Sequence, residues 1–96
     1  MKAGQILDAA KFLVEGDRKE THGEASSTMG IVATMWSAYL DHEVTAADAS
    51  RMMTLMKIGR AAGGQKIMDH DLDGAAYLAI AGEIEAMAKA TKAEVI

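Results

Sequence analysis

Several residue types are absent or scarce in this 96-residue sequence, and each absence excludes a class of structure. There is no cysteine, which excludes disulfide bonds, thiolate nucleophiles and cysteine-bound metals, and which suits a reducing cytoplasm. There is no proline, and the aromatic residues are one Trp, two Tyr and one Phe. The β-branched and aromatic runs that predict strands are therefore missing, and we expect a single all-α domain over residues 1–96.

Long hydrophobic runs and concentrated positive charge are also missing. No apolar run approaches the roughly 20 residues needed to cross a bilayer, and no signal peptide is visible at the N-terminus, so we expect no membrane partner. The formal net charge is −4, and the ten Lys and Arg residues are scattered along the chain. This charge pattern argues against double-stranded DNA or RNA as a partner and leaves the cytoplasm as the expected location.

Apolar residues recur at helical spacing in four segments, which predicts a compact bundle of about four helices. The first helix is expected from about Gly4 to Glu15, with Gly16 as its stop. The second is expected to begin after a serine cap at Ser26 or Ser27. The expected breaks lie at residues 16–24, 41–44 and 63–68. The residues expected in the core from these two helices are Ile6, Leu7, Ala10, Leu13, Val14, Met29, Val32, Ala33, Trp36 and Leu40.

The third and fourth helices are expected in the second half of the chain. Thr45 and Asp48 have the spacing of a capping box, which starts the third helix, and the Gly63-Gly64 pair ends it. Its expected core residues are Ala49, Met52, Met53, Met56 and Ile58. The fourth helix is expected from residues 69–71 to about Ala90. Its first half has no wide polar face, so we expect burial on more than one side and completion of the bundle by homo-oligomerisation.

An acidic stretch with one histidine opens the expected fourth helix. Carboxylates in a first turn stabilise a helix by capping and by opposing its dipole, which is the structural interpretation of Asp69, Asp71 and Asp73. At 100° per residue, His70, Asp73 and Tyr77 share one face. The functional interpretation is that Asp69, His70 and Asp73 bind Mg²⁺, which needs few protein carboxylates when water and phosphate complete its coordination.

Four basic or titratable side chains are candidates for binding a phosphate. Lys57 and Arg60 are spaced i, i+3 near the end of the third helix, and the short loop that follows brings them close to the acidic stretch. Arg18 and His22 lie in the first expected loop. A guanidinium and a lysine that converge suit phosphate recognition. The same charges would equally form structural ion pairs with Asp69 or Asp73, and both interpretations stay open.

The chain resembles a family of small helical proteins encoded by phages and prophages, which has no assigned function. The matching segments are residues 6–10, Gly16-Asp17-Arg18 with His22-Gly23, 33–40, Met52-Met53 with 57–60, and Asp69 with 73–77. These segments run nearly from end to end and keep the family's order. His22 stands where members more often carry Tyr, and Ala75-Ala76 departs from a Gly-Tyr step. The resemblance implies an all-α protein in the cytoplasm of a bacterial host.

A more distant similarity links the last two helices to the MazG type of nucleoside triphosphate pyrophosphohydrolases. Those enzymes hold Mg²⁺ with Glu-x-x-Glu on one helix and Glu-x-x-Asp on a later one. His70-x-x-Asp73, followed by Tyr77, is similar to the second element with Glu replaced by His. The first element is missing, which argues against a site holding several Mg²⁺ ions. The similarity implies a helical half-bundle that holds a nucleotide.

Three functions from different classes follow from these features. The first is a homo-oligomer that binds a phosphorylated small molecule, such as a nucleotide, through Arg18, His22, Lys57, Arg60 and Tyr77. The second is a divergent Mg²⁺-dependent nucleotide pyrophosphohydrolase that uses Asp69, His70 and Asp73. The third is a non-catalytic interaction module, in which the charges pair internally and the outer surface carries the function.

Overall fold

Four α-helices make up the regular structure of the computed structural model, which describes residues 1–16, 24–64 and 67–95. In chain order the helices are α1 (Ala3–Glu15), α3 (Ala25–Leu40), α4 (Ala46–Ala62) and α5 (Met68–Val95). No strand occurs in these residues. The all-α class and the number of helices are therefore confirmed.

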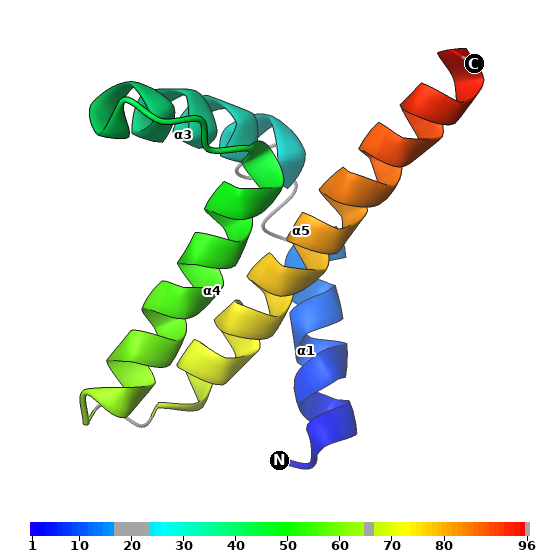
Figure 1. Ribbon diagram of the computed structural model, residues 1–96. Coiled ribbons are helices and arrows are strands. Elements are labelled where there is room, and N and C mark those ends of the chain that lie inside the picture. Colours follow the sequence, from blue (N-terminus) through cyan, green and yellow to red (C-terminus); the bar gives the residue numbers. More distant parts are fainter. Residues whose placement is uncertain (17–23, 65–66, 96) are drawn as a thin grey trace.

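The antiparallel pair of α4 and α5 forms the centre of the bundle (Figure 1). This pair has the most extensive contact of any two helices. α1 packs against α5, and α3 crosses the other end of the molecule, where it packs mainly against α4. The C-terminal part of α5 projects beyond the other helices. The turn between α4 and α5 lies at the end of α4 that is farthest from α3.

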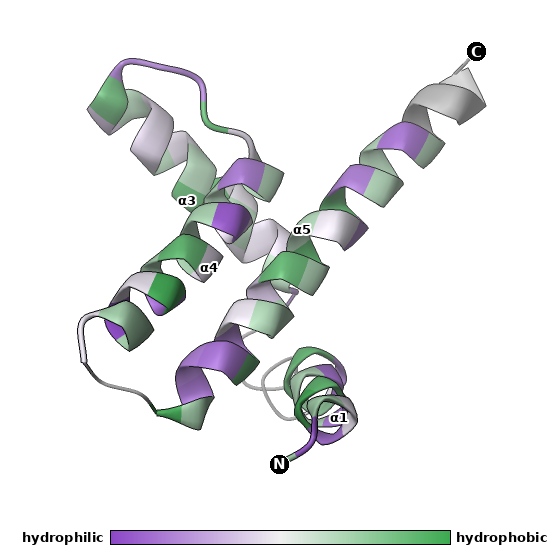
Figure 2. Cartoon of the chain, turned by 60° about the horizontal axis from the view of Figure 1, so that its bottom comes forward, coloured by the Kyte–Doolittle hydropathy of each residue, from purple (hydrophilic) through white to green (hydrophobic). Residues whose placement is uncertain are grey.

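The core is small and is built mainly from short side chains. The buried core cluster comprises Met29, Ala33, Ala49, Tyr77 and Ile80, which come from α3, α4 and α5. Trp36 and Val32 are partly buried against it, as expected from the second apolar stripe. Figure 2 shows hydrophobic segments on all four helices. Many large hydrophobic side chains on these helices are exposed, so the core buries only part of the apolar surface of the chain.

Helix ends follow the expected signals in part. The capping box of α4 is confirmed, since the Asp48 amide donates to Thr45 Oγ1 at 3.0 Å and the Asp48 carboxylate accepts from the Thr45 amide at 3.4 Å. The serine cap of α3 was wrong. The helix begins at Ala25 with Glu24 as its N-cap, because the Glu24 carbonyl already accepts from the Thr28 amide at 3.2 Å. α5 continues to Val95, beyond the expected end at about Ala90.

Several apolar residues that were expected in the core are exposed. They are Leu7, Leu40, Met52, Met56 and Ile58, with 38% to 62% of their surface accessible. The three residues of α4 in this set, Met52, Met56 and Ile58, stay uncovered because α3 crosses the end of α4 and does not lie along it. The expected burial of α5 on more than one side is confirmed. α5 is covered on two sides within one chain, by α1 and by α4, so its apolar surroundings do not require a second copy.

Among the described residues, no helix is long and apolar enough to span a bilayer.

Candidate functional site

Three side chains of α4 form polar contacts with α5, at successive turns of the two helices. Ser50 Oγ donates to the Tyr77 carbonyl at 2.6 Å, and Thr54 Oγ1 donates to the Gly74 carbonyl at 2.9 Å. One turn further, Lys57 Nζ lies 3.1 Å from Asp73 Oδ2. The donors are spaced i, i+4 and i+7, so they lie on one face of α4, and their partners run the opposite way along α5. This polar ladder leads from the core to the α4–α5 turn.

Gly74, whose carbonyl accepts from Thr54, faces α4 next to the Lys57–Asp73 pair. It is buried, and a Cβ atom placed there would lie 3.7 Å from Lys57 Cβ and 3.8 Å from Thr54 Cγ2. Those distances are ordinary van der Waals contacts. A small residue at this position therefore lets Lys57 pass along α5 and reach Asp73, although an alanine would also fit.

Lys57 and Asp73 form an ion pair with limited access to solvent. The Lys57 side chain is 14% exposed and that of Asp73 is 26% exposed. The structural interpretation, in which Lys57 pairs with an aspartate of the acidic stretch, is confirmed for this pair. The pairing fixes the lysine at the end of the ladder, and its remaining ammonium protons are still available to a further acceptor.

The other predicted phosphate-binding residues have different surroundings. Arg60 is exposed in the last turn of α4 and has no ion pair within the described part of the chain. The expected pairing of Arg60 with Asp69 or Asp73 does not occur there. Arg18 and His22 lie outside the described residues. The structure thus brings Lys57 and Asp73 together, and Arg60, three residues further along the same helix, has no ion pair with any described residue.

His70 is the unusual residue of the predicted metal set. It is 8% exposed, and neither ring nitrogen has a hydrogen-bond partner among the described residues. Asp69 and Asp71 on either side of it are exposed. No group of three His, Asp or Glu side chains converges as metal ligands in the described ranges. Asp69, His70 and Asp73 therefore do not form a complete protein-only cation site.

Tyr77, which the sequence predicted to share a face with His70 and Asp73, lies on the interior side of α5. It is 8% exposed and belongs to the core cluster, and its backbone carbonyl accepts from Ser50. All three residues of the face are buried or partly buried. The ring of Tyr77 is therefore a wall of the core, and its part in binding a ligand would be indirect.

A second ion pair between α4 and α5 was missed by the sequence reasoning. Arg51 Nη1 donates to Glu85 Oε1, and both side chains are nearly half exposed. The hydrogen bond from Arg51, together with its charge, lowers the pKa of the Glu85 carboxyl. The same bond raises the pKa of Arg51. Because 34 residues separate the two, only the antiparallel register of α4 and α5 reveals the pair.

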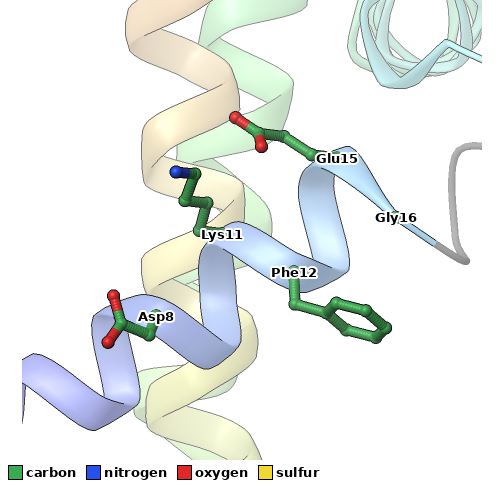
Figure 3. Close-up of a pocket in the computed structure, with 5 residues that line it drawn as sticks. All are labelled: Asp8, Lys11, Phe12, Glu15 and Gly16. Carbon is green, nitrogen blue, oxygen red and sulfur yellow. The ribbon is translucent and has the colours of Figure 1, made fainter.

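A shallow pocket of about 290 Å³ lies at the C-terminal end of α1. Its lining residues are Asp8, Lys11, Phe12, Glu15 and Gly16. Figure 3 shows Lys11 and Glu15 pointing to one side of the helix and Phe12 to the other, where its ring is 65% exposed. None of the predicted ligand-binding residues lines this pocket. It is an open surface depression with both charge signs, and it has no converging set of catalytic groups.

Comparison with known proteins identifies relatives among phages. The chain is 33% identical over 72 residues to the Gene 55 protein of Mycobacterium phage D29, which covers 75% of this chain and 48% of that protein. It is 35% identical over 83 residues to the Gene 55 protein of Mycobacterium phage L5, which covers 85% of this chain and 51% of that protein. The chain thus spans about half the length of the curated relatives it matches.

No solved structure matches the fold significantly. A family model described as "Domain of unknown function (DUF6378)" matches residues 5–85, which include most of α1, all of α3 and α4, and α5 as far as Glu85. This match covers the polar ladder and every predicted site residue. On this evidence the chain belongs to the DUF6378 family.

Proposed function

We propose that this phage-type helical protein binds a phosphorylated small molecule, with a nucleotide as the leading candidate, at the end of the bundle where α4 turns into α5. The observation that carries the proposal is the arrangement of two cations there. Lys57 is held by Asp73, and Arg60 follows three residues later with no partner in the described chain. A fixed ammonium beside a free, fork-shaped guanidinium suits a phosphate group.

His70 supports the same location. A buried imidazole without hydrogen-bond partners is costly and rare, and it often marks a functional position. His70 lies in the first turn of α5, close in sequence to Asp73. Arg18 and His22, the other predicted phosphate-binding residues, lie outside the described residues and carry no part of this proposal. The base or sugar of a nucleotide would then contact the α4–α5 end of the bundle, with Tyr77 forming a wall behind it.

Mg²⁺ is proposed to enter this site together with the ligand. The exposed carboxylates of Asp69 and Asp71 would otherwise repel a phosphate, and Mg²⁺ readily shares its coordination between protein carboxylates, water and phosphate oxygens. Divergent pyrophosphohydrolysis of the MazG type is the catalytic alternative at the same residues. It is less well supported, because the described residues contain no group of three potential metal ligands.

The proposal is tested by thermal denaturation and calorimetric titration with nucleoside mono-, di- and triphosphates and cyclic nucleotides, with and without Mg²⁺. A ligand at 100 times its Kd should stabilise the fold by about 2.7 kcal/mol. Arg60→Ala should weaken that ligand roughly 10- to 150-fold, which corresponds to loss of a charged hydrogen bond of about 1.5–3 kcal/mol. Since Arg60 has no ion pair in the described residues, the melting temperature without ligand should not change.

Lys89→Ala is the matched control. It removes one positive charge from an exposed position on α5, about 30 Å along the helix from its first turn. Ligand affinity should be unaffected by it. Failure of every nucleotide to stabilise the protein would contradict the proposal, as would equal weakening by Arg60→Ala and Lys89→Ala. Release of pyrophosphate or phosphate that requires Mg²⁺ would favour the hydrolase alternative.

A non-catalytic interaction module is the second candidate, and a separate observation favours it. Fifteen large hydrophobic side chains in the described residues are exposed, and they are spread over all four helices. Isolated exposed apolar residues are normal in soluble proteins, but extended apolar surface is typical of interaction sites. In this reading Lys57–Asp73 is only a structural ion pair, and no ligand would bind near Arg60.

A further inference from the structure

α3 has an unusual composition for a helix with an open outer face. None of its 16 residues is charged. Met29 and Ala33 are buried beneath it, while Ile31, Met35 and Tyr39 on the opposite side are 64%, 64% and 89% exposed. These three residues, spaced four apart, form one ridge along the helix, which is called the α3 ridge below. A polar outer face is normal for a surface helix. An uncharged apolar ridge therefore indicates a surface that packs against another protein chain in the functional state.

The amount of exposed surface supports a missing partner. The chain exposes 6831 Å², whereas a compact monomer of its 10.2 kDa mass should expose about 5,300 Å². Its radius of gyration is 14.5 Å, compared with about 12.5 Å expected for 96 residues. The excess of roughly 1,500 Å² is almost twice the approximately 800 Å² that each partner buries in a standard interface. One standard interface would therefore account for about half of the excess, and the projecting end of α5 also adds exposed area.

We propose that the α3 ridge is the contact surface of a symmetric homodimer. The ridge is centred on Met35, with one large apolar residue four positions to each side. When two such ridges cross about a two-fold axis at Met35, the two Met35 side chains meet, and Ile31 of each copy faces Tyr39 of the other. Because each copy has a net charge of −4, two copies repel each other electrostatically. A contact through α3 adds no charged side chain of its own to this repulsion. The uncharged ridge is thus self-complementary.

The outer face of α4 is the competing surface. It carries Met52, Leu55 and Met56, which are 38%, 64% and 38% exposed. On the same helix, Asp48 and Arg60 are exposed and Arg51 is engaged with Glu85. Burying this face would bring those charges to the edge of the contact, and Met52 and Met56 are less exposed than any residue of the α3 ridge. The α3 ridge offers more apolar area with no charge to desolvate.

The test compares two variants in sedimentation velocity from about 1 to 100 μM, a range that covers typical micromolar dissociation constants. Met35→Glu puts a charge at the centre of the proposed contact, and Leu55→Glu puts the same charge on the competing face. Met35 and Leu55 are equally exposed, at 64% each, so neither substitution should disturb the monomer fold. The wild-type chain and Leu55→Glu should sediment as dimers, while Met35→Glu should raise the dissociation constant by about 100-fold or more.

Three results would overturn the proposal. These are a wild-type chain that stays monomeric at 100 μM, dissociation by Leu55→Glu but not by Met35→Glu, and a dimer that survives both substitutions. Tyr39→Glu, at the most exposed position of the ridge, repeats the test if Met35→Glu loses its helical circular dichroism. The outcome is independent of the proposed ligand, because α3 lies at the end of α4 far from Lys57 and Arg60. Met35→Glu should therefore still bind any nucleotide that binds the wild-type chain.

Discussion

At the scale of single residues, the two buried polar side chains of the described structure have opposite surroundings. Ser50 is fully buried and donates to the Tyr77 carbonyl, so its hydroxyl is satisfied. His70 is buried as well, but neither ring nitrogen has a partner in the described ranges. A buried polar group without a hydrogen bond destabilises the fold. The chain tolerates this cost at His70, which is why the residue is a candidate for function.

His70→Leu is expected to stabilise the protein in the absence of ligand. Leucine fills a similar space without leaving polar atoms unpaired, so the free energy of unfolding should rise by about 1 kcal/mol or more. Urea denaturation monitored by circular dichroism measures the change. His42→Leu, at an exposed histidine, is the control and should have little effect. Destabilisation by His70→Leu would instead reveal a hydrogen-bond partner for His70 outside the described residues.

The Arg51–Glu85 pair should make a small, pH-dependent contribution to stability. The pKa of Glu85 is lowered in the folded chain by the hydrogen bond from Arg51. The stabilisation is therefore complete above the unfolded pKa, near 4.5, and is lost as the pH falls through the lower folded value. Glu85→Gln should lower the melting temperature slightly at pH 7, and the difference from wild type should vanish below that folded pKa.

Glu83→Gln is the control for this pH dependence. Glu83 is exposed on the same helix and has no ion pair among the described residues. Its substitution should change the melting temperature little at any pH. A difference between wild type and Glu85→Gln that persists at strongly acidic pH would show that the lost contact does not depend on the charge of Glu85.

At the scale of elements, the contact between α4 and α5 depends on small residues and on the polar ladder. Ala47, Ala49 and Ser50 of α4 are buried, as are Gly74, Ala76 and Ala81 of α5. Short side chains let two helices approach closely, which brings hydroxyls of α4 within reach of backbone carbonyls of α5. The register of the pair is then set by specific hydrogen bonds at 2.6 and 2.9 Å rather than by large interlocking side chains.

Gly74→Ala should stabilise the pair, even though Gly74 is buried in it. The added Cβ would make only ordinary contacts, at 3.7 and 3.8 Å, with Lys57 and Thr54. Alanine in a helix interior is favoured over glycine by about 0.5–1 kcal/mol. Gly82→Ala is the matched control on the same helix, since its Cβ would meet nothing within 4 Å. Chemical denaturation should show similar gains for both variants, and a loss confined to Gly74→Ala would mean that the helices are closer than described.

At the scale of the whole molecule, one chain buries little and exposes much. The core cluster contains only two large aliphatic or thioether side chains, Met29 and Ile80, together with Tyr77 and two alanines. Small domains with modest cores are often stabilised further by association. The exposed α3 ridge is the surface that we assign to that association.

The thermal stability of the wild-type chain should therefore depend on its concentration. Association of folded chains stabilises them by mass action, so the melting temperature should rise when the protein is concentrated 100-fold. Met35→Glu should melt at one temperature throughout that range. Differential scanning calorimetry measures both. A wild-type melting temperature that does not change with concentration would contradict a folded dimer.

The sequence by itself determined the local features of this protein. The absence of proline, the helical spacing of apolar residues and the Thr45–Asp48 capping signal correctly predicted four helices and the start of α4. They also placed His70, Asp73 and Tyr77 on one face of α5, although only the structure shows that this face turns inward. Each of these features depends on residues within a few turns of one another, so periodicity and capping rules are enough to predict them.

Only the tertiary structure decided which face of each helix is covered and which charges meet. Periodicity cannot reveal that α3 crosses the end of α4, and it placed Leu40, Met52 and Met56 in a core that does not reach them. It also left Lys57 with two possible roles until the register of α4 and α5 paired it with Asp73. Long-range packing sets these outcomes, because an apolar stripe specifies that a helix packs but not what it packs against.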